Sequence, residues 1–196
     1  NQCMFIHLRL HTEFSVVDGT VRIDEGVKAA QSYGQGALAI TDLSNLFGTV
    51  KFYKEARGAG IKPLIGAEVW LEGFASSEWG KEAKLGRVLL LVQNKQGYLN
   101  LSELLARAWT QSGARTQAVV KLEWLLALNE GLLLLRGAQA GPVRHDLVQG
   151  DTARAGDIVG DLAIAQARAF FLHHLQPGAF KKLKQPDGRR CLRLGL

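Results

Sequence analysis

The chain has 196 residues, of which 47% are hydrophobic, and carries a formal net charge of +6. This length and apolar content exclude a disordered chain and indicate one folded domain with its own hydrophobic core. No apolar run is long enough to span a bilayer, no charged and then apolar leader opens the chain, and the two cysteines form no disulfide or metal-binding framework, so we expect a cytoplasmic protein with no membrane contact.

The first predicted element is a strand over residues 5–10, at the start of the stretch FIHLRLHTEFSVVDG. Because side chains alternate along a strand, His7, Arg9 and His11 are expected on one face, with apolar residues on the other. Two imidazoles and the nearby carboxylate of Asp18 are typical ligands of a divalent metal, whereas a guanidinium stays protonated and cannot be a ligand. The stretch is therefore compatible with a metal site or with a polar, hydrogen-bonded cluster.

Helical and strand patterns alternate through the rest of the chain. The spacing of apolar residues predicts helices over residues 23–34, 46–59, 97–110, 121–129, 142–149 and 152–169. Short apolar runs predict strands over residues 37–41, 61–72, 87–94, 131–137 and 170–175. Residues 73–86 are expected to form an exposed loop, and residues 111–120 a polar connector.

Strands that alternate with helices and consist of continuous apolar runs indicate an α/β fold with a parallel sheet. Ligand sites in such folds lie at the carboxyl ends of the strands. Polar residues follow several of the predicted strands: His11, Asp42, Glu68 and Asn94. This placement predicts a site, or the remains of one, at one face of the domain. The sequence has no phosphate-binding glycine motif, Gly-x-Ser-x-Gly motif or Cys-x-x-Cys motif that would define its chemistry.

The positive charge is concentrated at the end of the chain. Residues 181–196 hold six basic side chains against one acid, Asp187. The remainder has 18 basic and 17 acidic residues (24 less 6, and 18 less 1), a net charge of +1. The charge therefore does not indicate a nucleic-acid-binding body, although the tail alone is compatible with a DNA-binding arm.

Four contiguous segments resemble one known family: FIHLRLHTEFSVVDG, ALAITDLSNLFGTVKFYKEARGAGIKPLIGAEVWL, LLLVQNKQGYLNLSELLARA and LNEGLLLLRG. In this order they are similar to the N-terminal PHP (polymerase and histidinol phosphatase) domain of bacterial replicative DNA polymerase III alpha subunits. The resemblance implies a distorted, TIM-like β/α barrel, seven-stranded in the family. It also implies a PHP domain over residues 1–180, whose barrel is incomplete at the C-terminal end, and a basic tail over residues 181–196.

Active members of this family hold divalent metals with His, Asp, Glu and Cys ligands, and the resemblance assigns their positions here. Three ligand positions are retained: His11 in the first motif, Asp18 before a glycine, and Glu68 in the segment IGAE. Four ligand positions are replaced, by Arg9, Leu43, Arg87 and Ala138. His7 is a further vestigial candidate. The family's last ligands, an Asp and a His, have no counterpart within these 196 residues.

Two arginines in one cavity oppose a metal, since unit charges about 4 Å apart interact by roughly 4 kcal/mol at an effective dielectric of 20. We expect Arg9 and Arg87 to replace the positive charge of the metals and to pair with Asp18 and Glu68. No metal, cofactor or catalytic residue is then expected; in an active site the metal would be zinc, manganese or iron. The departure resembles the degenerate sites of proteobacterial alpha subunits.

By resemblance, the parent protein would be a DNA-directed DNA polymerase, a nucleotidyltransferase of DNA replication, and this chain a non-catalytic part of it. In relatives with a degenerate site, the PHP domain docks the proofreading exonuclease subunit, beside the rest of the replicative polymerase that contacts DNA in the holoenzyme. Two alternatives stay open. One is a small metal-dependent phosphoesterase or 3′–5′ exonuclease that uses His7, His11, Asp18 and Glu68; the other is a DNA-binding fragment that acts through the tail.

Overall fold

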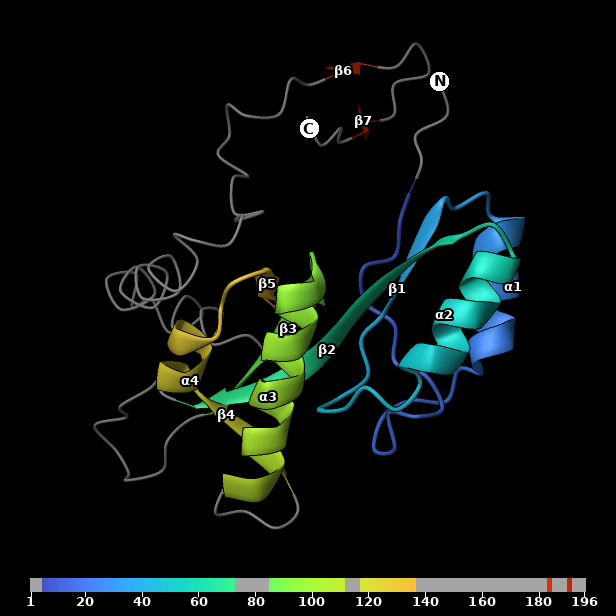
Figure 1. Cartoon of the computed structure of the whole chain (residues 1–196). Helices are drawn as coiled ribbons and strands as arrows, with labels where there is room; N and C mark the ends of the chain where they lie inside the picture. The colour runs from blue at the N-terminus through green and yellow to red at the C-terminus, as the bar shows by residue number, and fades with distance from the viewer. Residues whose placement is uncertain (1–4, 73–84, 112–116, 137–182, 185–189, 192–196) are drawn as a thin grey trace.

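The computed structural model describes residues 5–72, 85–111, 117–136, 183–184 and 190–191 (Figure 1). Its helices are α1 (Ile23–Ser32), α2 (Thr49–Gly58), α3 (Lys95–Gln111) and α4 (Leu122–Ala127). Its strands are β1 (Ala37–Ile40), β2 (Lys62–Glu72), β3 (Gly86–Val92), β4 (Val119–Lys121), β5 (Leu132–Arg136), β6 (Leu183–Lys184) and β7 (Arg190–Cys191). None of the helices in the described residues has the length and hydrophobicity needed to cross a membrane.

The helices and strands predicted between residues 23 and 136 are confirmed, with ends that differ by a few residues. The predicted connector over residues 111–120 is wrong at its end, where Val119 and Val120 belong to β4, a strand of three residues that is too short to show a strand period. Residues 112–116 of the connector lie outside the described part of the chain. Residues 73–84 of the predicted loop lie outside the described part of the chain, as do the elements predicted over residues 142–175. Their predictions are therefore not tested.

The sheet of five strands mixes parallel and antiparallel pairs. Strands β1 and β4 both pair with β2 in parallel, whereas β3 is antiparallel to β2 and to β5. The α/β class is thus confirmed, but the expectation of a parallel sheet is right only for β1, β2 and β4. The apolar runs of β3 and β5 suggested parallel strands because both of their faces are packed, and two-sided packing removes the polar alternation. The described strands do not close into a barrel.

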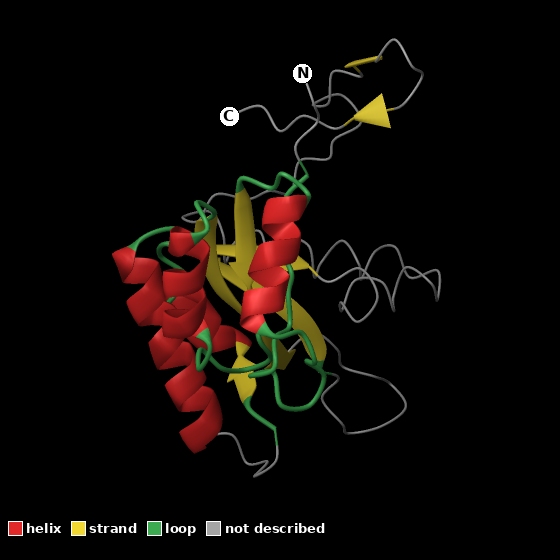
Figure 2. Cartoon of the chain, turned by 90° about the vertical axis from the view of Figure 1, so that its right-hand side faces the viewer, coloured by secondary structure: helices red, strands yellow, loops and turns green. Residues whose placement is uncertain are grey.

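One face of the sheet carries the four helices of the described residues (Figures 1 and 2). Leu38 and Ile40 of β1 pack in a cluster with α1 and α2, and residues of β2, β3 and β5 pack in a second cluster with α3 and α4. Ile65 of β2 is paired with Ile40 of β1, and paired residues lie on the same face of the sheet. Because side chains alternate along a strand, Ala67 and Val69 of β2 lie on that face as well. The long strand β2 therefore joins two helix-covered halves into one layer.

The opposite face of the sheet carries no helix from the described residues. Its side chains are apolar at one end of the sheet and charged at the other. The apolar cluster comprises Ala39, Leu89 and Leu91, with partly buried Leu8, Leu64, Leu133 and Leu135 against it. Glu68, paired with Leu89, and Trp70, paired with Arg87, lie on this same face. The register of β2 and β3 therefore places the charged residues beside the apolar cluster.

The segment predicted as a first strand runs beside β1 but is not a regular strand. The N–H group of Ala39 donates to the backbone oxygen of His7, and that of Thr41 to the backbone oxygen of Leu10. The step from His7 to Leu10 is three residues, whereas the step from Ala39 to Thr41 is two, so the first segment has one extra residue. This extra residue resembles a β-bulge and shifts the alternation of side chains. Leu8 packs on the helix-free face, while Leu10 packs with α1 and α2. The expectation that these two side chains share one face is wrong for this reason.

Candidate functional site

The candidate site is built around Glu68, a carboxylate in the interior of the sheet. Glu68 is 2% exposed and lies on the helix-free face of β2. Its backbone is held on one side by β3 and on the other by the loop after β1, where its N–H donates to Asp42 and its oxygen accepts from Ser44. A buried carboxylate at this place is costly unless cationic partners surround it.

The loop that follows His11 brings a second carboxylate, that of Asp18, to the site. The start of this loop is held by Asp42, whose side chain accepts hydrogen bonds from the backbone N–H and the hydroxyl of Thr12, at 2.6 and 2.8 Å. The hydroxyl of Ser15 donates to Asp18 at 2.7 Å. Gly19 closes this turn, because a Cβ there would run into the backbone oxygen of Thr12. The turn therefore fixes the direction in which the Asp18 carboxylate points.

The imidazole of His11 lies between the two carboxylates. Its Nδ1 is 2.9 Å from Asp18 Oδ1, within a hydrogen bond, and its Nε2 is 2.9 Å from Glu68 Oε2. The second contact is close but not aligned as a hydrogen bond. It is a contact of opposite charges whenever the ring is protonated.

Two guanidinium groups contact the two carboxylates. Arg9 donates to Glu68 Oε2 at 2.9 Å. Arg87 Nη1 lies 3.0 Å from Asp18 Oδ2 and 3.6 Å from Glu68 Oε2. The Arg87 guanidinium also stacks on the ring of Trp70, 4.5 Å from its centroid. Arg87 thus bridges both carboxylates from a fixed position.

The protonation states follow from these contacts. The contact with Glu68 raises the pKa of His11 above its ordinary value, against the effect of burial, and Asp18 adds to the rise. Burial by itself would raise the pKa of Glu68, but His11 and Arg9 outweigh it and hold the pKa below its ordinary value. Asp18 behaves in the same way, with Ser15, His11 and Arg87 as the groups that lower its pKa. The site therefore favours protonated His11 between ionised carboxylates.

The other residues predicted for the site lie elsewhere. The exposed ring of His7 makes an edge contact with Phe5, and His7 is outside the cluster of His11, Asp18 and Glu68. Leu43 lies at the edge of the site, where it bridges Glu68 through the backbone and lines a cavity. Ala138 is outside the described residues.

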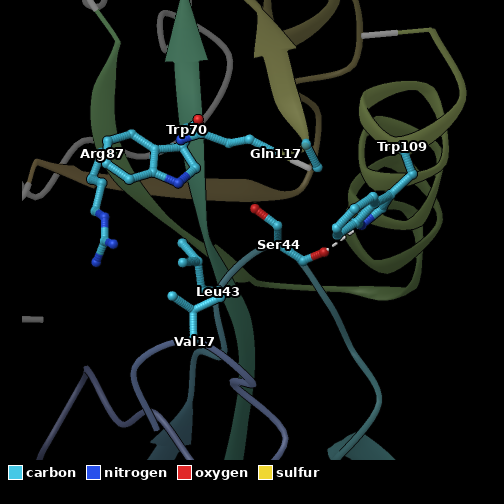
Figure 3. Close-up of a pocket in the computed structure, with 8 residues that line it drawn as sticks. Val17, Leu43, Ser44, Trp70, Arg87, Trp109 and Gln117 are labelled. Atoms are coloured by element: carbon cyan, nitrogen blue, oxygen red, sulfur yellow. Dashed lines mark hydrogen bonds between the residues drawn. The ribbon is translucent and has the colours of Figure 1, made fainter. Parts of the chain in front are cut away.

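A cavity of about 220 Å³ adjoins the charged cluster (Figure 3). Its walls include Val17, Leu43, Ser44, Trp70, Arg87 and Trp109. The indole N–H of Trp109 donates to the backbone oxygen of Ser44 at 2.8 Å, which fixes one wall. Sequence reasoning did not single out the serine or either tryptophan, because their proximity depends on the packing of α3 against the loop after β1.

His11, Asp18 and Glu68 are a donor set of the kind that holds a divalent metal, with one donor atom each and all within 4.8 Å of one another. The same oxygens are already engaged, however. Glu68 Oε2 faces Arg9, His11 and Arg87, and Asp18 contacts Arg87 and His11. A cation placed among these atoms would face two permanent positive charges, so the residues as arranged do not fit a metal.

The fold and the site together define an α/β domain with a His–Asp–Glu group of metal-ligand type on the helix-free face of its sheet. This chain belongs to the PHP domain family, whose family model, described as "PHP domain", matches residues 7–173.

Similar curated proteins are described as DNA polymerase III subunit alpha. The protein of Pseudomonas aeruginosa is 45% identical over 77% of this chain, and that of Escherichia coli K12 is 35% identical over 91% of it. The matched regions are 12% and 14% of those two proteins, so the chain spans a small part of the relatives' length. A solved structure described as a metal-dependent phosphoesterase, from Bifidobacterium adolescentis, is 22% identical with a TM-score of 0.39 and covers 53% of this chain and 32% of that chain. At that score it supports no argument about this chain.

Proposed function

We propose that this chain is the PHP portion of a DNA polymerase III alpha subunit and serves DNA replication as a scaffold, with its phosphoesterase site inactivated. The supporting similarity is 35–45% identity to alpha subunits over most of the chain. Residues 1–180 would form the PHP domain and residues 181–196 a separate basic tail. The chain would carry no polymerase activity itself and would act in the cytoplasm.

The observation that carries this proposal is the position of Arg87. One guanidinium lies between the two carboxylates that a metal would need, and a second, from Arg9, lies on the more buried of them. Arginine has no lone pair to offer a metal and stays charged at any physiological pH. The carboxylates are therefore compensated by the chain itself, and no reacting water is activated.

Metal content and phosphoesterase activity test the proposal together. The purified chain, incubated with zinc, manganese or iron and then desalted, should hold far less than one metal per chain and should not hydrolyse phosphoesters or a DNA 3′ end. The matched variant Arg87→His removes the bridging charge and offers a ligand in its place, so it should retain more metal than the wild type. A full equivalent of metal in the wild type, with turnover, would contradict the proposal.

The retained donor set favours one second candidate, a small metal-dependent phosphoesterase that uses His11, Asp18 and Glu68. A divalent metal would supply an activated water in such an enzyme. This candidate requires metal-dependent turnover that His11→Ala abolishes, while the exposed His7→Ala leaves turnover unchanged.

We further propose that the scaffold docks the proofreading exonuclease subunit of the replicative polymerase. The apolar side chains of Val16, Val17 and Phe47 are 82%, 84% and 72% exposed, and they are therefore available for contact with a partner. Titration of the purified exonuclease subunit with the full chain by calorimetry should give a saturable 1:1 complex. An absence of binding heat and of co-migration in gel filtration would rule out this partner.

A further inference from the structure

Trp70 is the residue that lies directly opposite Arg87 in the sheet. The two are paired across β2 and β3, so both side chains lie on the helix-free face with their Cβ atoms about 5 Å apart. Glu68 lies two residues before Trp70 on the same strand and therefore on the same face. Arg87 thus reaches Glu68 diagonally across the two strands, and the indole is the neighbour of both residues.

The Arg87 guanidinium is covered on one side by this indole. Its central carbon, Cζ, lies over the Trp70 ring, 4.5 Å from the ring centroid (Figure 3). The five N–H groups of a guanidinium lie in its plane, so an aromatic ring over its face leaves these donors free for carboxylates. Arg87 uses them in this way, since its Nη1 lies 3.0 Å from Asp18 Oδ2 and 3.6 Å from Glu68 Oε2. The indole and both carboxylates therefore contact one guanidinium group.

Arg9 has no such contact with a ring. Within the described part of the chain, no aromatic ring lies over the Arg9 guanidinium, and its side chain is 58% exposed, against 19% for Arg87. Fixing an arginine side chain costs more rotamer entropy than fixing most others, and a cation–π contact offsets part of that cost. The position of Arg87 therefore has a source of stabilisation that the position of Arg9 lacks.

We propose that Trp70 is a positioning residue for Arg87, and that the exclusion of metal from the His–Asp–Glu group depends on this indole. A metal can use the carboxylate oxygens only when the guanidinium leaves them, and the guanidinium then also leaves the indole. The free energy of the cation–π contact is therefore part of what a bound metal must overcome. This inference rests on the proposed replacement of the metal by arginine, and it adds the residue that makes Arg87 effective there.

The experiment measures the affinity of the full chain for zinc, by competition with a chromophoric zinc indicator. Trp70→Leu keeps an apolar side chain but removes the ring, so its affinity should be roughly 3- to 30-fold higher than that of the wild type, the range of one cation–π contact. Trp70→Phe keeps a ring for Arg87 and should stay near the wild-type value. The control Trp124→Leu removes an indole of α4 that lies under Lys121, and it should leave zinc binding unchanged.

Two further variants tie the effect to Arg87 and to the site. In the background Arg87→Met, Trp70→Leu should not change the affinity for zinc, because no guanidinium is left to position. The gain should also vanish when His11→Ala is added, because zinc bound by other residues would not need this imidazole. In ¹H–¹⁵N spectra, the Arg87 Nε–H signal should be visible at neutral pH in the wild type and in Trp70→Phe, and lost to exchange with water in Trp70→Leu.

The outcomes separate this inference from the proposed function. If Arg87→Met gains no affinity for zinc, or if the wild type holds a full equivalent, the charge replacement itself is wrong, and the inference is wrong with it. If Arg87→Met gains affinity and Trp70→Leu does not, only the role of Trp70 is wrong. A gain that persists in the Arg87→Met background would overturn that role as well, since the indole would then act without the arginine.

A measurement on the wild type covers the case in which Trp70→Leu does not fold. Trp70→Met then takes its place in the zinc titration. In the wild type, the side-chain protons of Arg87 should show the upfield shift of protons that lie over an indole ring, and those of Arg9 should not. Unshifted Arg87 protons would mean that the indole does not hold this side chain, and the inference would fail.

Discussion

Arg87 contributes more to the charge balance of the site than Arg9 does. It contacts both carboxylates, and its guanidinium lies over the ring of Trp70. The side chain of Arg87 is 19% exposed, whereas that of Arg9 is 58% exposed, so solvent screens the Arg9 contact with Glu68 far more. The loss of Arg87 would leave Asp18 without its guanidinium partner and Glu68 dependent on Arg9 and His11.

The substitution Arg87→Met tests this difference. Methionine keeps the apolar stem but removes the charge, so the two carboxylates should lose compensation and the free energy of unfolding should fall by about 2–3 kcal/mol. The matched change Arg107→Met breaks an exposed pair with Glu103 within α3 and should cost no more than about 0.5 kcal/mol. Urea unfolding of the two variants measures both values. Equal losses would mean that Arg87 has no special role in stability.

His11 should make stability depend on pH near neutrality. Its pKa is raised in the folded state, so the stabilisation is fully present below the ordinary value of 6.5 and is lost as the pH rises through the folded pKa. His11→Gln should therefore flatten the decline of the melting temperature as the pH rises above 6.5. At the acid end, Asp18 and Glu68 have lowered pKa values, so their contribution is lost as the pH falls below their ordinary 3.8 and 4.5. A slope that survives in His11→Gln would place its origin in another group.

The sequence predicts which residues belong to the site better than it predicts which atoms meet. The pattern and the resemblance together supply His11, Asp18, Glu68 and the two arginines. The contact of Arg87 with Asp18 depends on β3 running antiparallel to β2 with Trp70 opposite position 87, a register that exists only in the folded sheet. The pocket depends on tertiary packing alone, because Ser44 and Trp109 are 65 residues apart in the chain.

At the scale of elements, the predictions are confirmed for the helices and strands between residues 23 and 136 and fail for the regular strand expected over residues 5–10. Helices α1 to α4 and the long strand β2 have clear periods and are found where they were expected. The first segment has the alternation of a strand, yet it takes three residues where β1 takes two. Nothing in its composition marks that extra residue, because the shift is set by packing of Leu8 and Leu10 on opposite faces of the sheet.

Gly97 allows the start of α3 to approach the turn before β5. A Cβ there would collide with the backbone of Gly131, which cannot give way as a flexible side chain could. Gly97→Ala should therefore lower the free energy of unfolding by more than about 2 kcal/mol, even though alanine favours helices. Gly58→Ala, at the end of α2 with nothing within 4 Å, should be neutral or stabilising by up to about 1 kcal/mol. Thermal melts of the pair check the prediction, which fails if both variants respond alike.

At the scale of the whole molecule, the sheet is apolar on both faces although only one carries the described helices. Leu90 packs under α3 on the helix-covered face, and its neighbour Leu89 packs on the other with 5% exposure. The charged cluster shares this second face. The carboxylates thus lie beside a buried apolar layer, which strengthens their contacts with the arginines.

Leu89→Ala measures how much of the stability comes from that second layer. A buried leucine truncated to alanine typically costs about 2–5 kcal/mol, and we expect a value in this range for Leu89 as for Leu90. The control Leu99→Ala removes a side chain that is 50% exposed on α3 and should cost less than about 1 kcal/mol. Chemical denaturation gives the three values. A cost for Leu89 as small as that for Leu99 would show that the second face contributes little.

The two guanidinium groups on the carboxylates are joined to the chain by covalent bonds. A chelator cannot strip them, a competing ion cannot displace them, and scarcity of trace elements cannot leave their places vacant. The positive charge that compensates Asp18 and Glu68 is therefore part of the polypeptide itself. Every folded copy of the chain therefore has this charge, whatever the supply of metal ions.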